Sequence, residues 1–215
     1  MTLGIVTTLS DSVLFVADGR ERHAIQGDIN TDDKNKFLSI GRGNVGLIGI
    51  GVAEVTEFAE GILRRSTLEE MDITQVCREV QRALAAGWED VLPRMPASIN
   101  LQDRKIHATF LIGGVIDGQP FVTSIPSLPF SSPAFPIFCE AFAFVANIER
   151  AANLYHEGLA KTLGEDPSGT EPILDVLKLG EQIIRHTEAF DCYVGGTVRF
   201  SQVDQSGVKN CGKLS

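Results

Sequence analysis

Thr2 is the residue of this sequence whose type and position could do chemistry most directly. If the bond after Met1 is cleaved, Thr2 carries a hydroxyl group and a free α-amine on one residue. An α-amino group has a pKa of roughly 8, so at neutral pH it can accept the hydroxyl proton and leave a nucleophilic oxygen. Methionine aminopeptidases act before a residue as small as threonine, so we expect Met1 to be removable. The alternative is that threonine is only a tolerated second residue, and position alone does not decide between the two.

The segments that follow Thr2 predict a β-hairpin. Residues 3–9 and 13–18 are two apolar runs separated by a Ser-Asp-Ser turn signal. A hairpin returns the end of its second strand to the start of its first. We therefore expect Asp18 to lie near Thr2.

Two lysines further along could bring a positive charge to the same place. Lys34 and Lys36 are two residues apart in a strand-like segment, and side chains at that spacing on a strand share one face. A nearby positive charge lowers the pKa of a hydroxyl group because it stabilises the anion. Either lysine could point at Thr2, and Asp18 could hold it in place.

The order and spacing of these residues resemble those of the proteasome β-subunit family, the threonine peptidases of the amino-terminal-nucleophile hydrolase superfamily. The distance from Thr2 to Asp18 fits that family without a gap, and residues 16–20 resemble its Ala-Ala-Asp-Ser-Arg segment. Residues 49–54 resemble its Gly-Gly-Ala-Ala-Asp turn into a helix, and residues 191–198 resemble its Asp-x-x-Ser-Gly-Gly segment. The resemblance spans nearly the whole chain and is that of a divergent, bacterial-type homologue.

This resemblance implies a peptidase in which Thr2 attacks the peptide carbonyl and its own amine takes the proton. Lys36 would lower the pKa of the hydroxyl, Asp18 would orient Lys36, and Asp191 would orient the amino terminus. Lys36 fits the second ungapped stretch but requires an insertion of two residues after Asp18. Lys34 keeps the ungapped distance, so it remains an alternative.

The resemblance also assigns an oxyanion site and shows two departures. The backbone N–H of Ile50 or Gly51 would stabilise the tetrahedral oxyanion, a role that depends on the main chain. Val194 and Ala146 stand where the family has serines that help to set the protonation of the threonine amine. Valine and alanine have no hydroxyl group to replace them, although Asn147 could supply a polar group or cap a helix instead.

Three functions are compatible with these residues. The first is a proteasome-like threonine peptidase that acts on peptides or unfolded proteins as a homo-oligomer, with a ring and an unfoldase partner as further implications of the resemblance. The second is a catalytically impaired or inactive ring or scaffold subunit of the same fold, for which Ala146 and Val194 are the evidence. The third is an amidohydrolase acting on a small amide.

Composition narrows the class of protein further. The 215 residues are 43% hydrophobic and no Pro/Ser-rich linker divides them, so we expect one domain over residues 1–215. No run approaches the roughly 20 apolar residues of a membrane span, and we expect a cytoplasmic protein without membrane contact. A net charge of −9 argues against a nucleic-acid partner. The cysteines and histidines lack metal-binding spacing, so we expect neither a metal nor a cofactor.

Hydrophobic periodicity predicts strands, two helices, strands, two helices and strands, in that order. This is the order expected of an α+β fold, a four-layer αββα sandwich of two antiparallel sheets flanked by helices. We expect residues 126–138 to form an extended loop, since four prolines are too many for a central strand. The expected strands are residues 3–9, 13–18, 35–41, 44–51, 106–112, 121–125, 192–203 and 208–212, and the expected helices are residues 53–66, 72–92, 147–164 and 171–188.

Overall fold

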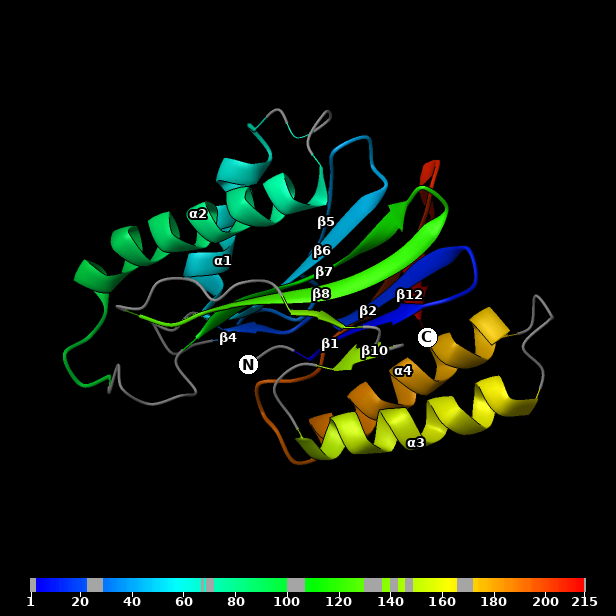
Figure 1. The fold of residues 1–215 in the computed structure, drawn as a ribbon. Helices are drawn as coiled ribbons and strands as arrows, with labels where there is room; N and C mark the ends of the chain where they lie inside the picture. Colours follow the sequence, from blue (N-terminus) through cyan, green and yellow to red (C-terminus); the bar gives the residue numbers. More distant parts are fainter. Residues whose placement is uncertain are drawn as a thin grey trace.

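Two antiparallel sheets form the middle of the molecule, and a pair of helices covers the outer face of each (Figure 1). The computed structural model describes residues 3–22, 29–66, 68, 72–99, 107–129, 137–139, 143–145, 149–165 and 172–214. Thr2, Ala146 and Asn147 therefore lie outside the described residues. The predicted fold class, a four-layer αββα sandwich, is confirmed.

The first sheet has the strand order β10-β1-β2-β11-β12, and the second has the order β5-β6-β7-β8-β9. The strands of the first sheet are β1 (Gly4–Thr8), β2 (Ser12–Asp18), β10 (Ala143–Val145), β11 (Val198–Asp204) and β12 (Gly207–Leu214). Those of the second are β5 (Phe37–Ile40), β6 (Val45–Gly51), β7 (Ala108–Ile116), β8 (Gln119–Ser127) and β9 (Ile137–Cys139). A separate two-stranded ribbon pairs β3 (Glu21–Arg22) with β4 (Ile29–Thr31).

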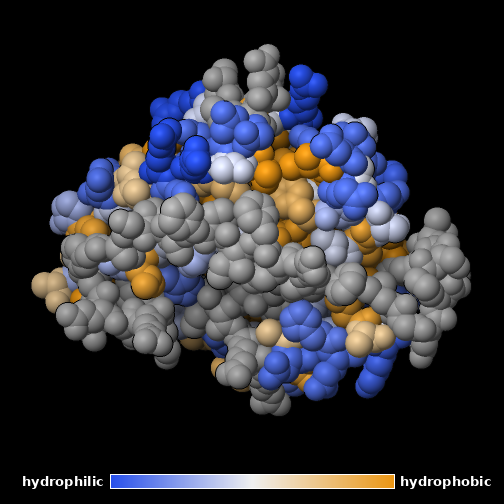
Figure 2. Space-filling model, in the orientation of Figure 1, coloured by the Kyte–Doolittle hydropathy of each residue, from blue (hydrophilic) through white to orange (hydrophobic). Residues whose placement is uncertain are grey.

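Four α-helices form the outer layers. They are α1 (Ala53–Leu63), α2 (Ile73–Val91), α3 (Glu149–Glu165) and α4 (Pro172–Glu188), with a short 3₁₀ turn, Leu92–Arg94, after α2. Figure 2 shows mainly hydrophilic residues over α2 and α3 on the visible face, as expected for helices whose other side packs on a sheet. Among the described residues, no helix combines the length and apolar composition needed to cross a bilayer.

The strands β1, β2, β6 and β7 are buried on both faces, which explains why they appear in the sequence as continuous apolar runs. Along β2, Phe15 packs between the two sheets, whereas Leu14 faces the layer formed by α3 and α4. On the other side, Leu47 and Phe110 pack against α1 and α2 together with Trp88. Three apolar layers therefore hold the sheets and helices together.

Glycines at positive φ explain where several strands end. At the turn between β7 and β8, Asp117 has φ 50° and Gly118 has φ 73°, the combination required by a type I′ hairpin turn. Before β11, Gly195 has φ 142° and Gly196 has φ 77°. The prediction of a strand starting at residue 192 was therefore wrong, because these glycines interrupt an extended strand and β11 begins at Val198.

The expectation of a loop over residues 126–138 was also wrong at both ends. Pro126 lies inside β8, opposite Thr109 of β7. This position tolerates proline because β9 pairs only with Val122 to Ser124 of β8. At Pro126, β8 is therefore not paired with β9 on the edge away from β7. Residues 137–139 form β9, and residues 130–136 lie outside the described residues.

A buried hydrogen bond joins the α3 layer to β1, and its removal should be measurable. The hydroxyl groups of Thr7 and Tyr155 are 2.6 Å apart, both residues are buried, and burial raises the pKa of Tyr155 to about 12. Tyr155→Phe should lower the free energy of unfolding by about 1 to 3 kcal/mol, because it leaves the Thr7 hydroxyl without this partner. Urea unfolding measures the loss. Adding Thr7→Val should recover part of it, and an unchanged midpoint in Tyr155→Phe would contradict the prediction.

Candidate active site

The Asp18 carboxylate, at the end of β2, connects the start of the chain to a lysine. Its Oδ1 accepts hydrogen bonds from the Leu3 backbone N–H at 2.9 Å and from Lys36 Nζ at 3.1 Å. Its Oδ2 accepts from the Gly195 N–H at 3.1 Å. The predicted hairpin is confirmed, since β1 pairs with β2 and the Asp18 N–H donates to the Leu3 carbonyl. Leu3 N is the atom to which Thr2 is covalently bonded, so the carboxylate lies one residue from the predicted nucleophile.

Lys36 lies in the same buried cluster and is only 6% exposed. Its ammonium also donates to the carbonyl of Arg20. Burial lowers the pKa of Lys36, although Asp18 opposes this effect. Burial likewise raises the pKa of Asp18, although Lys36 and the two backbone N–H groups oppose it. The pair thus places a cation with a weakened hold on its proton beside the first residues of the chain.

Lys34 and Lys36 do not lie in a strand, and the expectation of a strand there was wrong, although both residues line one pocket. Both lie in the irregular segment before β5, so the two-residue alternation of a strand does not apply to them. Lys34 Nζ forms ion pairs with Glu57 and, at 3.2 Å, with Glu21 Oε2. Of the two alternatives, the structure therefore brings Lys36, and not Lys34, to Asp18.

Arg20 binds the loop whose Gly195 N–H donates to Asp18, a role that was not predicted from the sequence. Its Nη1 donates to the carbonyls of Val194 at 3.1 Å and Cys192 at 3.4 Å. Its Nε and Nη2 pair with Asp32 at 2.7 Å and Glu188 at 3.2 Å. The signal was available, since Arg20 ends the segment of residues 16–20 that carries Asp18.

Asp191 and Val194 lie in this loop but are not brought to Lys36. The Asp191 Oδ1 accepts from the N–H of Tyr193 at 2.8 Å, which is the geometry of an Asx turn. Val194 is fully buried in the same apolar cluster as Leu3. The orienting role predicted for Asp191 stays a prediction, because the amino terminus itself lies outside the described residues.

Gly51 is the better placed of the two candidate oxyanion donors. The neighbouring Val52 N–H is already engaged, since it donates to the His107 carbonyl at 2.9 Å. The Ile50 side chain is buried between the sheets, whereas Gly51 lines a pocket that Lys36 also lines. Gly51 has φ 97°, and a Cβ there would stand 2.0 Å from the His107 oxygen, so only glycine fits this backbone.

The arrangement can perform acyl transfer if a nucleophile stands at the start of the chain. The Asp18 oxygen that accepts the Leu3 N–H also holds the buried Lys36 ammonium, and Gly51 lines the same pocket as Lys36. These are the electrostatic and oxyanion components that a peptide hydrolase needs. Within the described part of the chain, no group of three or more potential metal ligands occurs.

Comparison with known proteins identifies the fold. Neither a protein-family model nor a curated protein sequence matches this chain. The solved structure of an Anbu (Gly-1) mutant from Hyphomicrobium sp. strain MC1 is similar, with a TM-score of 0.66 and 17% identity over 100% of this chain and 87% of that one. Anbu, described as an ancestral β-subunit, from Yersinia bercovieri has a TM-score of 0.62 and 14% identity over 99% of this chain and 87% of that one. For the helical assembly of the Anbu complex from Pseudomonas aeruginosa, the TM-score is 0.67 and the identity 14%, over 99% of this chain and 86% of that one.

At these identities the likeness concerns the fold alone. It extends over nearly the whole chain, so it covers both sheets and both helical layers. The chain has the fold of these Anbu structures.

Proposed function

We propose that this protein is a threonine-type peptidase whose nucleophile is Thr2, exposed by cleavage after Met1. The observation that carries the proposal is the Asp18 carboxylate, which binds both the Leu3 N–H and the Lys36 ammonium through one oxygen. This contact links the backbone of Leu3, the residue after Thr2, to a buried cation. A strand that merely begins after a surface threonine does not require a buried carboxylate–ammonium pair at its first backbone N–H.

In the proposed reaction, Thr2 Oγ attacks the peptide carbonyl and the α-amine of Thr2 accepts the hydroxyl proton. The Lys36 ammonium stabilises the developing alkoxide electrostatically, and the Gly51 N–H donates to the oxyanion. The tetrahedral intermediate then breaks the C–N bond, and the α-ammonium returns its proton to the leaving amine. Water attacks the resulting threonyl ester, with the α-amine again as base, and releases the acid and free Thr2.

A non-catalytic scaffold of the same fold is the second candidate, and Val194 is the observation that favours it. The Val194 side chain is buried among apolar residues, so no hydroxyl group is offered at that position. A positioned proton-transfer group typically contributes roughly a hundred- to ten-thousand-fold to a rate. Its loss leaves the nucleophile in place but can remove turnover.

Assembly into a homo-oligomer belongs to both candidates. The similar Pseudomonas aeruginosa structure is a helical assembly of the Anbu complex, which supports association of this chain with copies of itself. Exposed apolar side chains on two helices, Phe58 on α1 and Leu174 on α4, offer contact area for it. A closed or helical particle would enclose the sites and restrict them to peptides or unfolded proteins.

The intact mass of the purified protein, before and after incubation with a peptide epoxyketone, tests the proposal. This probe bonds both the hydroxyl and the α-amine of an amino-terminal threonine. We expect loss of Met1 and a gain of one probe per chain. Thr2→Ala should abolish the adduct while allowing the same cleavage, and Thr2→Ser should retain it because the hydroxyl remains. A free Thr2 that stays unmodified would favour the scaffold instead.

A further inference from the structure

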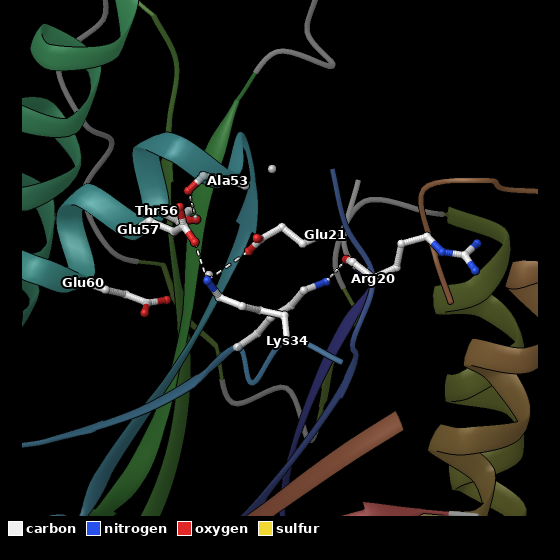
Figure 3. Close-up of a pocket in the computed structure, with 10 residues that line it drawn as sticks. Arg20, Glu21, Lys34, Ala53, Thr56, Glu57 and Glu60 are labelled. Atoms are coloured by element: carbon white, nitrogen blue, oxygen red, sulfur yellow. Dashed lines mark hydrogen bonds and ion pairs between the residues drawn. The ribbon is translucent and has the colours of Figure 1, made fainter. Parts of the chain in front are cut away.

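A pocket adjoins Lys36 of the buried Asp18–Lys36 pair (Figure 3). It is bounded by the segment after β2, by the end of β6 and by the first turns of α1. Lys36 and Gly51, the proposed cation and oxyanion donor, both line it. A pocket shared with the oxyanion donor is where a peptidase of this kind would place the side chain next to the scissile bond. The lining residues are Arg20, Glu21, Lys34, Lys36, Gly49, Gly51, Ala53, Thr56, Glu57 and Glu60.

Three carboxylates and one ammonium set the charge of this pocket. The Glu21 side chain is only 4% exposed, and it accepts from Asn30 Nδ2 at 2.7 Å. The Lys34 ammonium lies between Glu21 and Glu57 and pairs with both, as Figure 3 shows. Glu60 adds a third carboxylate from the same helix as Glu57.

The other two cations that line the pocket are neutralised elsewhere. Lys36 is paired with Asp18. The Arg20 guanidinium points away from the pocket in Figure 3 and is paired with Asp32 and Glu188. The pocket therefore holds one more negative than positive charge when the Glu60 carboxyl is protonated, and two more when it is ionised.

The charge of the Glu60 carboxyl group can change near neutral pH. Its side chain is 14% exposed, and its nearest cation, Arg64 Nη2, is 3.9 Å away. Burial raises the pKa of Glu60 to about 7; Arg64 and Lys34 oppose this shift, whereas Glu57 and Glu21 add to it. A cation that entered the pocket would favour the ionised form and would so be bound more tightly as the pH rises through this range.

We propose that the pocket selects substrates with lysine or arginine on the acyl side of the scissile bond, with Glu57 and Glu60 binding the cationic group. This deepens the proposed peptidase function and rests on it. A cationic side chain would find carboxylates in excess and could share Glu57 with Lys34. An acidic side chain would find the Lys34 ammonium already held by two carboxylates and the Lys36 ammonium held by Asp18, so it would be repelled.

Labelling rates with matched epoxyketones test this preference. Three probes should differ only in the side chain next to the warhead, carrying lysine, norleucine or glutamate, and the second-order rate of adduct formation should be followed by intact mass. We expect the lysine probe to react about tenfold faster than norleucine, and the glutamate probe to react slowest. Glu57→Gln and Glu60→Gln should each lower the ratio of lysine to norleucine rates by about threefold to tenfold.

A matched control removes one carboxylate elsewhere. Glu79→Gln on α2 deletes the same charge from a residue that does not line the pocket, where its partner is the exposed Arg82. Its rate ratio should equal that of the unchanged protein. The norleucine probe reports in every variant whether the nucleophile is still competent, so a folding defect is not mistaken for lost selectivity.

The pH dependence of the ratio gives an independent readout. The nucleophile contributes equally to both rates, so its own titration cancels in the ratio of lysine to norleucine. We expect this ratio to rise between about pH 6 and pH 8 as Glu60 ionises, and to be flat in Glu60→Gln. If the norleucine or glutamate probe reacts as fast as the lysine probe or faster, only the proposed charge selection is overturned. Failure of all three probes overturns the peptidase function and this proposal with it.

Discussion

Lys36→Met is expected to lower the free energy of unfolding by about 3 to 5 kcal/mol, since it removes one partner of a buried ion pair. The Asp18 carboxylate would keep only the Leu3 and Gly195 N–H groups, in a place without access to solvent. The uncompensated charge is then either retained at high cost or neutralised by a proton. Adduct formation at Thr2 should also be lost, because the cation proposed to stabilise its alkoxide is removed. Urea unfolding measures the first effect and intact mass the second.

Two further variants distinguish the loss of the Asp18–Lys36 ion pair from the general effect of removing a lysine. Lys213 is 53% exposed and pairs with Asp33 at the surface, so Lys213→Met should cost less than about 1 kcal/mol. The double variant Asp18→Asn with Lys36→Met should be more stable than the sum of its single changes, because the two residues interact directly. Additive losses in this cycle would show that the pair does not act as a unit.

The strands and helices could be predicted because each has a pattern of its own. Residues 13–17 are a continuous apolar run because β2 is buried on both faces, and α2 repeats apolar residues along one side. The hairpin of β1 and β2 is local, so its turn signal was enough to bring Asp18 back to the start of the chain. The short strands β3, β4, β9 and β10 were missed, since two or three residues carry no periodicity.

The contents of the site were harder to predict because they come from distant segments. Lys34 and Lys36 belong to an irregular stretch, where spacing does not determine the direction of a side chain. Arg20 itself could be found in the segment of residues 16–20, but its partners lie in a loop about 170 residues further along, and no sequence pattern links the two. The pocket likewise combines Glu21 with Glu57 and Glu60 of α1, so its charge becomes visible only when the layers are assembled.

Gly51→Ala is expected to be the most damaging single change to the site that leaves every charged group in place. A Cβ at this position would stand 2.0 Å from the His107 oxygen, and a φ of 97° is strained for alanine. Strain of this kind costs about 1 to 3 kcal/mol, and the contact with backbone must also be relieved by movement of β6 or β7. Either movement displaces the Gly51 N–H from the pocket.

The loss of an oxyanion donor typically lowers a rate by roughly a hundred- to a thousand-fold. We expect Gly51→Ala to slow adduct formation by at least about a hundredfold, beyond any decrease in stability measured by urea unfolding. Gly61 provides the control, because it lies within α1 and a Cβ there meets only the end of the Arg65 side chain at 3.9 Å. Gly61→Ala should be neutral or stabilise the helix by up to about 1 kcal/mol, with unchanged labelling. Full labelling in Gly51→Ala would move the oxyanion role to the Ile50 N–H, the other candidate on this strand.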